Sequence, residues 1–148
     1  MAETENIQEI QEPHSDFVHL HVHSDYSLLD GASKITTLVT RANELGFKAL
    51  ALTDHGNMFG VLNFERICNE NGIKPIIGCE IYMAAGKKED KEGTPEGSKY
   101  YHLILLAKDE DGYKNLSWIV SEANTNGYYY KPRADRELLK KYSKGLIC

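Results

Sequence analysis

The stretch HLHVHSDYSLLDG, residues 19–31, places three histidines within five positions and follows them with two aspartates. The overlapping run FVHLHVH (17–23) alternates with period two, which predicts a β-strand. In an extended strand His19, His21 and His23 point to one face, and the apolar residues between them point to the other. A lone histidine in a strand is usually a hydrogen-bonded core or surface residue, but three in register favour binding of a shared cation.

The composition of the 148 residues, 41% hydrophobic and 26% charged, is typical of one soluble globular domain. No apolar run approaches the roughly 18–20 residues that span a membrane, and the N-terminus lacks the basic and apolar regions of a signal peptide. Cys68, Cys79 and Cys148 are odd in number and form no CxxC pair, which favours a reduced, cytoplasmic protein.

The net charge of −5 belongs to one end of the chain. Residues 1–16 hold five acidic residues and no Lys or Arg, so residues 17–148 are neutral overall. We therefore expect residues 1–16 to form a disordered acidic tail. A neutral remainder lacks the basic footprint of a stand-alone nucleic-acid-binding domain.

Periodic patterns predict alternating strands and helices along the rest of the chain. Strands are predicted at 17–23, 48–53, 75–83 and 101–107 and from 146 onward; helices are predicted after Ser33 to Gly46, from Val61 to Gly72, from Tyr113 to near Gly127, and after Asp135 to Gly145. The charged segment 84–99 is predicted to be a mobile surface loop, and 128–133 a connector.

This alternation indicates an α/β fold of βαβ units with mostly parallel strands and flanking helices. The strands fit either an open sheet or an incomplete barrel. Because the chain ends inside an apolar strand, we favour the barrel and expect the sequence to be a piece of a larger protein.

Further polar residues follow the other predicted strands. Asp54 and His55 come directly after the second strand in TDHG, Glu80 lies late in the third, and Asp30 lies just beyond the first. The C-terminal ends of parallel strands form the rim where α/β proteins place their sites. His102 lies early in its strand, so the pattern leaves a structural role equally open for it.

A mixed histidine and carboxylate set suits Zn²⁺, Mn²⁺ or Fe²⁺ better than Ca²⁺ or Mg²⁺. Two or three adjacent ions can activate water and neutralise phosphate oxygens, which is the chemistry of phosphoester hydrolysis. No Walker P-loop, GxSxG or GxGxxG motif is present. Lys131 and Arg133 could contact phosphate, although an exposed connector is the favoured interpretation of their segment.

Four blocks in order, HLHVHSDYSLLDG, LTDHGNMFG, IKPIIGCEIY and YYHLILLAKDEDGYKNL, resemble the PHP (polymerase and histidinol phosphatase) domain. The match is closest to the type found at the N-terminus of bacterial replicative DNA polymerases of the DnaE type, and it covers residues 17–148. The resemblance implies an incomplete, distorted (β/α)7 barrel, cut before the domain ends, with a cluster of up to three divalent ions, Zn and/or Mn.

The family's motifs carry its ligands onto this chain residue by residue. The implied metal ligands are His21, His23, Asp30, His55, Glu80 and His102. Asp54 is implied as an alternate ligand or as a carboxylate that orients an imidazole from behind. His19 precedes the aligned pair and is expected to be buried scaffold. About three further family ligands, a Cys or His and an Asp-x-His pair, lie beyond the chain, and Cys148 is interpreted as core.

The function implied by the resemblance is that of a replicative DNA-directed DNA polymerase, whose own aspartates and Mg²⁺ site lie outside these residues. The implied partners are DNA, deoxynucleotides, the sliding clamp and the proofreading exonuclease subunit, with no membrane. A metal-dependent 3′–5′ exonuclease activity of the PHP part is our hypothesis. The alternatives are a stand-alone phosphoesterase of the histidinol-phosphatase type and a non-catalytic, metal-stabilised scaffold.

Overall fold

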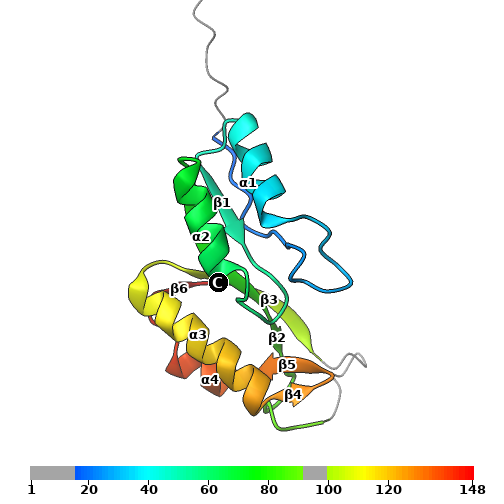
Figure 1. Ribbon diagram of the computed structural model, residues 1–148. Helices are drawn as coiled ribbons and strands as arrows, with labels where there is room; N and C mark the ends of the chain where they lie inside the picture. The colour runs from blue at the N-terminus through cyan, green and yellow to red at the C-terminus, as the bar shows by residue number, and fades with distance from the viewer. Residues whose placement is uncertain (1–15, 92–99) are drawn as a thin grey trace, which may run out of the picture.

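The computed structural model describes residues 16–91 and 100–148 (Figure 1). The predicted acidic tail, apart from Asp16, and residues 92–99 of the predicted loop lie outside this part. In chain order the elements are α1 (Ile35–Glu44), β1 (Ala49–Leu52), α2 (Val61–Glu70), β2 (Lys74–Met83), β3 (Tyr101–Ala107), α3 (Glu110–Thr125), β4 (Tyr128–Tyr129), β5 (Lys131–Ala134), α4 (Arg136–Lys141) and β6 (Leu146–Ile147). Within these ranges no helix is long and apolar enough to cross a membrane.

Strand β2 is the centre of a mixed sheet. Its first half pairs with β1 and its end pairs with β5, both in parallel, whereas β3 runs antiparallel to it. The ladders between β3 and β6 and between β4 and β5 are also antiparallel. This corrects the predicted predominance of parallel strands within the α/β fold. Parallel neighbours need a crossover that is usually a helix, and the sequence of 84–99 has no helical periodicity.

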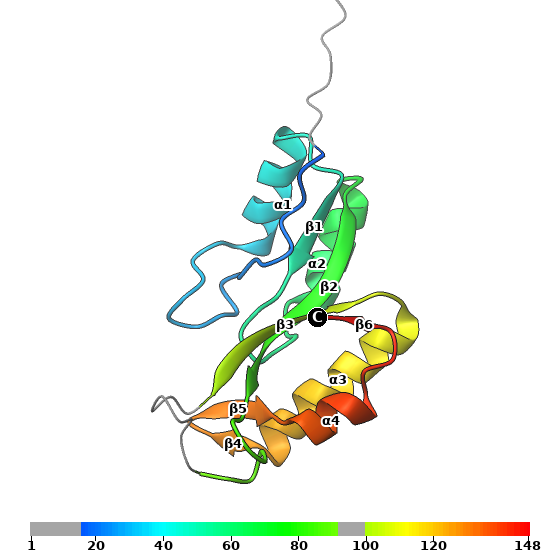
Figure 2. The same cartoon turned by 180° about the vertical axis from the view of Figure 1, so that it is seen from behind.

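Two apolar clusters hold the helices against the sheet. One joins α1, β1 and α2 through residues such as Val39, Leu52 and Phe64, and the other joins β2 and β3 to α3 and α4 through Ile81 and Leu116. Each such side chain contributes roughly 1.5–3 kcal/mol when it is fully buried. Figures 1 and 2 show α1 and α2 beside β1 at one end of the molecule, with α3 and α4 together at the other.

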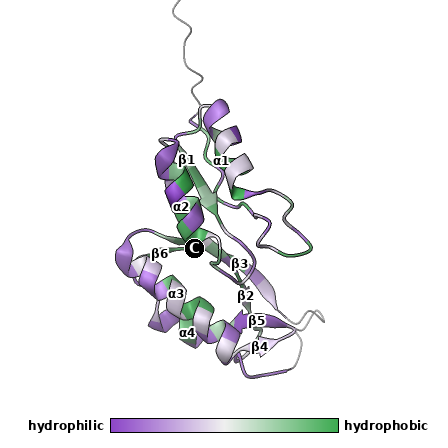
Figure 3. Cartoon of the chain, in the orientation of Figure 1, coloured by the Kyte–Doolittle hydropathy of each residue, from purple (hydrophilic) through white to green (hydrophobic). Residues whose placement is uncertain are grey.

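Hydropathy along the elements agrees with this packing. Figure 3 shows β1 hydrophobic along its length, whereas α2 and α3 carry both hydrophilic and hydrophobic residues. The buried residues of α3 are Gly112, Leu116, Ile119 and Ala123, spaced three and four apart. This is the spacing that places side chains on one helix face, and the helix lays that face on the sheet.

The segment 17–23 does not form the predicted regular strand. It lies along β1, where His19 accepts a hydrogen bond from Ala51 N at 3.0 Å and Val22 accepts one from Thr53 N at 2.8 Å. From the first bond to the second, this segment advances by three residues (19 to 22), whereas the neighbouring chain advances by two (51 to 53). The chain bends at residues 20 and 21. The extra residue breaks the strict alternation, as a β-bulge does.

The bend also corrects the prediction that the three histidines share one face and that His19 is buried. His19 is exposed, with its ring centroid 4.7 Å from that of Phe17 and 5.5 Å from that of Phe47. Only His21 and His23 of the three contact Glu80.

Two boundary predictions are wrong for local reasons. Ser33 does not cap α1, because its carbonyl oxygen closes the preceding loop by accepting a hydrogen bond from Asp25 N; Lys34 is the N-cap instead. The predicted connector 128–133 forms the β4–β5 hairpin, whose turn holds Tyr130 at a φ of 62°.

Two further residues lie in surroundings that differ from those predicted. Arg133 is buried, and its guanidinium donates hydrogen bonds to the backbone carbonyls of Lys88 and Gly127. Cys148 is exposed rather than part of the core, because it follows the last paired residue of β6.

Candidate metal centre

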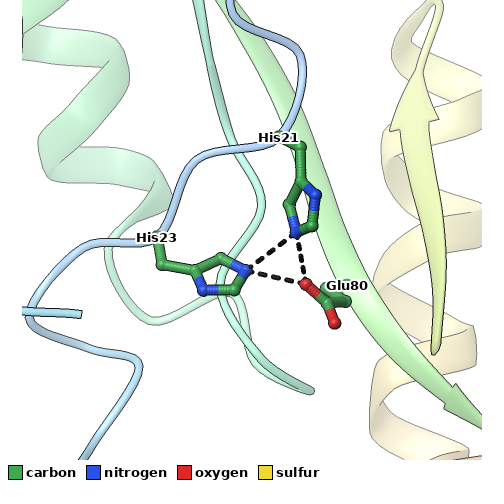
Figure 4. Close-up of side chains that lie close together, drawn as sticks. All are labelled: His21, His23 and Glu80. Atoms are coloured by element: carbon green, nitrogen blue, oxygen red, sulfur yellow. Dashed lines mark hydrogen bonds and ion pairs between the residues drawn. The ribbon is translucent and has the colours of Figure 1, made fainter. Parts of the chain in front are cut away.

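Glu80 is the buried centre of a cluster of imidazoles. Its side chain, on β2, is 3% exposed. Oε2 contacts His21 Nε2 and lies 2.7 Å from His23 Nε2, while Oε1 lies 2.7 Å from His102 Nδ1 and 3.5 Å from His55 Nδ1. Figure 4 shows the rings of His21 and His23 both pointing at this carboxylate. Four imidazoles from three parts of the chain therefore share one acid.

Asp30 supplies a second carboxylate on the solvent side. Its Oδ2 lies 2.5 Å from His23 Nδ1 and 3.1 Å from His55 Nε2. His23 thus contacts a different carboxylate through each of its ring nitrogens. Two overlapping groups have their donor atoms within 4.8 Å of one another: His21, His23 and Glu80, and His23, Asp30 and His55.

The direction of β3 explains why His102 joins the site from the start of its strand. Because β3 is antiparallel to β2, the beginning of β3 lies beside the end of β2, and Tyr82 is directly opposite His102. Residues opposite one another in a ladder, and residues two apart along a strand, point to the same face. His102 and Glu80 therefore meet on one face, although the rule for parallel strands would not place His102 there.

The loop from Ser24 to Ser33 carries Asp30 to the cluster. A Cβ on Gly31 would lie 1.9 Å from the carbonyl oxygen of Ser24, so only glycine lets the loop close this tightly. A pocket of about 350 Å³ lies against the loop, lined by His21, His23, Asp30 and Gly31. The candidate centre is thus open to solvent on the side of the loop.

Asp54 supports this loop from behind. Its buried carboxylate accepts hydrogen bonds from the backbone N of Ser24 at 2.6 Å and from the hydroxyls of Ser24 and Ser27 at 2.7 and 2.6 Å. Ser27 Oγ accepts in turn from the backbone N of His55 at 3.1 Å. These bonds go to serines rather than to imidazoles, so Asp54 positions the backbone that carries the cluster.

The acids of the cluster are held in their charged forms. Burial raises the pKa of Glu80, but contacts with His21 and His23 outweigh it, so the pKa lies below its ordinary value. The contact with His23 likewise lowers the pKa of Asp30. Burial lowers the pKa of His55, partly opposed by the charge of Glu80, which favours the neutral imidazole that binds metals.

The donor set fits a divalent cation. The Nε2 atoms of His21 and His23 lie 3.0 Å apart, and each also contacts Oε2 of Glu80. The two nitrogens cannot both carry a proton that points at the other. In the part of the chain that the structure describes, His55 Nδ1 is a buried nitrogen without a hydrogen-bond partner. A cation accepts the lone pairs of such nitrogens and neutralises both carboxylates, and nitrogen with oxygen ligands suits Zn²⁺ and Mn²⁺.

All six predicted ligands thus lie in one connected cluster. Sequence reasoning missed Tyr82, whose ring stacks on His55. Burial raises the pKa of Tyr82 to about 12, so its phenol is neutral. The signal was present, because Tyr82 follows Glu80 by two residues and must share its face if the strand is regular. The loop-closing function of Gly31 was also missed, since no periodicity reports it.

The fold and the cluster agree with a family assignment. The model of the PHP domain matches residues 19–148, so the chain belongs to the PHP domain family. Its curated relatives include the DNA polymerase III subunit alpha of Treponema pallidum, 58% identical over 132 residues, and that of Borreliella burgdorferi, 54% identical over 134 residues. These alignments cover 89% and 90% of this chain but 11% and 12% of the relatives, so the chain spans about a tenth of their length.

Solved structures agree on the fold. A protein from Bifidobacterium adolescentis described as a metal-dependent phosphoesterase superposes with a TM-score of 0.51 at 22% identity, over 72% of this chain and 32% of the other. An amidohydrolase from Chromobacterium violaceum, with bound sulfate and no metal, superposes with a TM-score of 0.50 at 26% identity, over 71% and 34%. The mixed α/β architecture is therefore shared with these two proteins.

Proposed function

We propose that His21, His23, Asp30, His55, Glu80 and His102 bind a cluster of divalent cations and that the cluster hydrolyses phosphodiesters. The observation that carries the proposal is the meeting of four imidazoles on one buried carboxylate, with a second carboxylate at the open side. Zn²⁺ and/or Mn²⁺, up to three ions, are the metals we propose.

When bound, the cations supply an activated water and neutralise phosphate oxygens. The chain's own contribution is to hold the donors in register. Glu80 and Asp30 each contact more than one ring, which brings the ring nitrogens close together, and Asp54 holds the loop that bears Asp30. The exposed His21 and Asp30 leave the open side free for a strand of nucleic acid.

For the whole protein, we infer that residues 17–148 are the N-terminal part of a PHP domain at the start of a DNA-directed DNA polymerase. The support is the identity of more than half of the aligned residues to polymerase III alpha subunits about eight times as long as this chain. The polymerase would bind DNA, deoxynucleotides and Mg²⁺ elsewhere in the protein, and the sliding clamp and proofreading exonuclease would be its partners, in the cytoplasm. The PHP site would add a 3′–5′ exonuclease.

The experiment uses the full-length protein, purified free of other nucleases, and its double variant His21→Ala/His23→Ala. We expect the variant to lose bound Mn²⁺ or Zn²⁺, measured by elemental analysis, and to degrade a 5′-labelled single strand at least tenfold more slowly. Its polymerase rate should be unchanged. His19→Ala is the matched control, because that histidine lies in the same segment but outside the cluster.

Other outcomes decide between the alternatives. A double variant with full metal content and full nuclease rate contradicts the proposal. A wild-type protein that holds metal but hydrolyses neither DNA nor a small phosphate monoester is the metal-stabilised scaffold. Hydrolysis of the monoester alone indicates a phosphatase of the histidinol-phosphatase type, a reading that the phosphoesterase-like fold supports.

A further inference from the structure

Tyr82 lies at the point where two strand ends of the candidate centre meet. It is 3% exposed, follows Glu80 by two residues on β2, and is the ladder partner of His102. Its side chain therefore shares the face of Glu80 and not the face that packs on α3. A large aromatic ring is buried beside the cluster, although it belongs to neither group of metal donors.

The ring of Tyr82 contacts two of the imidazoles that come from separate elements. It stacks on His55 with the centroids 5.7 Å apart and the planes 10° from parallel. It meets His102 with the centroids 5.2 Å apart and the planes at 72°. One ring therefore contacts the imidazole that follows β1 with its face and the imidazole that begins β3 in an edge-on geometry, both of which are favourable aromatic arrangements.

The position of the Tyr82 ring is itself fixed from several sides. Gly56 has a φ of +60°, and a Cβ there would lie 3.2 Å from the ring, so glycine allows the close approach of the backbone. Tyr100 packs against the ring at a centroid distance of 4.8 Å, and Lys131 Nζ lies 5.5 Å from its centroid. The ring of Tyr82 is thus held in one position by its packing.

The polar contacts of His55 and His102 leave their ring planes weakly constrained. His102 is half exposed and contacts the cluster through one nitrogen, at Glu80. His55 holds Asp30 at 3.1 Å through Nε2, while its Nδ1 stands 3.5 Å from Glu80 without a hydrogen bond. These polar contacts alone leave each imidazole able to turn about its own bond.

Ring packing restricts that rotation. His55 also lies against His23, with the centroids 4.1 Å apart, and His102 stacks on Tyr100 at 5.7 Å. Tyr82 is the buried ring that contacts both His55 and His102, so it constrains the two ring planes together.

We propose that Tyr82 is a positioning residue that sets the ring planes of His55 and His102 before a cation binds. This rests on the proposed function in so far as the two rings are ligands. The phenyl ring carries the effect, so Tyr82→Phe should behave as wild type and Tyr82→Leu should not. Partners that orient ligand rings are typically worth 10–100-fold in metal affinity.

The first measurement needs no metal. In the metal-free chain, the imidazole protons of His55 and His102, whose ring centroids lie 5.6 Å apart, should give NOE cross-peaks that report the relative orientation of the two rings without involving Tyr82. We expect these cross-peaks to persist in Tyr82→Phe and to weaken in Tyr82→Leu. Unchanged cross-peaks in Tyr82→Leu would overturn the proposal. Tyr82→Met, which fills similar space with a flexible chain, is the second variant if the leucine variant does not fold.

The second measurement is Mn²⁺ affinity by calorimetric titration. We expect Tyr82→Leu to bind Mn²⁺ at least tenfold more weakly than wild type, with Tyr82→Phe within twofold of it. Leu105→Ala is the control for lost stability, because Leu105 is buried in the same sheet on the face toward α3; it should retain wild-type affinity. Equal weakening in Leu105→Ala and Tyr82→Leu overturns the proposal.

The failures of the two proposals can be told apart. If the wild-type chain binds no Mn²⁺ or Zn²⁺ but the NOE cross-peaks follow the pattern above, Tyr82 positions the rings and the proposed function is wrong. If the wild type binds metal and the cross-peaks do not depend on Tyr82, the metal site stands and the positioning role is wrong.

Discussion

Glu80 is the residue on which the candidate centre depends. A buried carboxylate is costly unless it is paired, and this one lies against His21, His23 and His102. Its removal would leave those imidazoles without their common partner. The same logic applies to Asp54, whose three hydrogen bonds hold the serines of the neighbouring loop.

A residue outside the histidine cluster offers a test of pH dependence. Asp135 is the N-cap of α4, and its carboxylate accepts hydrogen bonds from the backbone N of Leu138 at 2.8 Å and of Lys88 at 3.0 Å. Burial raises its pKa, but these bonds outweigh burial and hold the pKa below its ordinary value of 3.8. We expect Asp135→Ala to lower the free energy of unfolding by about 1 kcal/mol at pH 7.

The sign of the pH effect follows from the lowered pKa. The charged carboxylate contributes its stability above the ordinary pKa, and that contribution is lost as the pH falls through the folded-state pKa. Urea unfolding of wild type and Asp135→Asn should therefore give free energies that converge below about pH 4. A difference that is constant from pH 7 to pH 3 would contradict the assignment of the charged cap.

Single residues also mark how far the sequence could predict the site. The clustered side chains and their strand-end positions were readable, because imidazoles and carboxylates just after apolar strands are visible in the pattern. The burial of Arg133 was not readable, because its partners are backbone carbonyls 6 and 45 residues away in the chain. Every residue has a backbone carbonyl, so the sequence does not show which carbonyl will accept a hydrogen bond.

At the scale of elements, the apolar periodicities were sufficient for α1, α2, α3 and the longer strands. They gave the wrong direction for β3, because its run LILLA is continuously apolar, as is typical of a buried parallel strand, although β3 is antiparallel to β2. They also missed the hairpin of β4 and β5, whose turn uses Tyr130 at positive φ instead of the usual glycine or asparagine. The segment 17–23 was mispredicted because one extra residue changes its alignment with β1.

The loop that carries Asp30 offers a test at this scale. In Gly31→Ala the new Cβ would collide with the carbonyl oxygen of Ser24, so the loop must open. We expect a loss of about 1–3 kcal/mol in the free energy of unfolding and weaker Mn²⁺ binding. Both are measured on the same preparation, by urea unfolding and by calorimetry.

Gly72→Ala is the matched control for that experiment. Gly72 also has a positive φ, of 67°, but a Cβ there meets nothing within 4 Å. The control should lose roughly 1 kcal/mol from backbone strain and keep its Mn²⁺ affinity. Normal Mn²⁺ binding by Gly31→Ala would mean that loop closure does not matter to the centre.

For the whole molecule, the candidate centre connects the two apolar clusters. His21, His23 and His55 come from segments beside β1, which belongs to the first cluster, while His102 comes from β3, which contributes Leu105 to the second. A ligand that binds only the folded state stabilises it by mass action, by about 2.7 kcal/mol at a concentration 100 times its Kd. We expect Mn²⁺ at that excess to raise the Tm of the chain by roughly 5–10 °C.

Differential scanning calorimetry with Mn²⁺ and then with excess chelator would measure this shift. The chelator should return the Tm to its starting value. The double variant His21→Ala/His23→Ala should melt at the same temperature with and without Mn²⁺. An equal rise in wild type and double variant would indicate that Mn²⁺ acts elsewhere on the protein.

The pairing of Tyr82 with His102 has a consequence for how the chain tolerates change. A slip of β3 by one residue would turn His102 to the helix-covered face and bring Tyr101 or Leu103 to the site in its place. Insertions between Met83 and Tyr101 are therefore harmless only while they leave this alignment intact. The number of cations bound per chain would then report the alignment of β3 with β2 in natural or engineered variants of that connection.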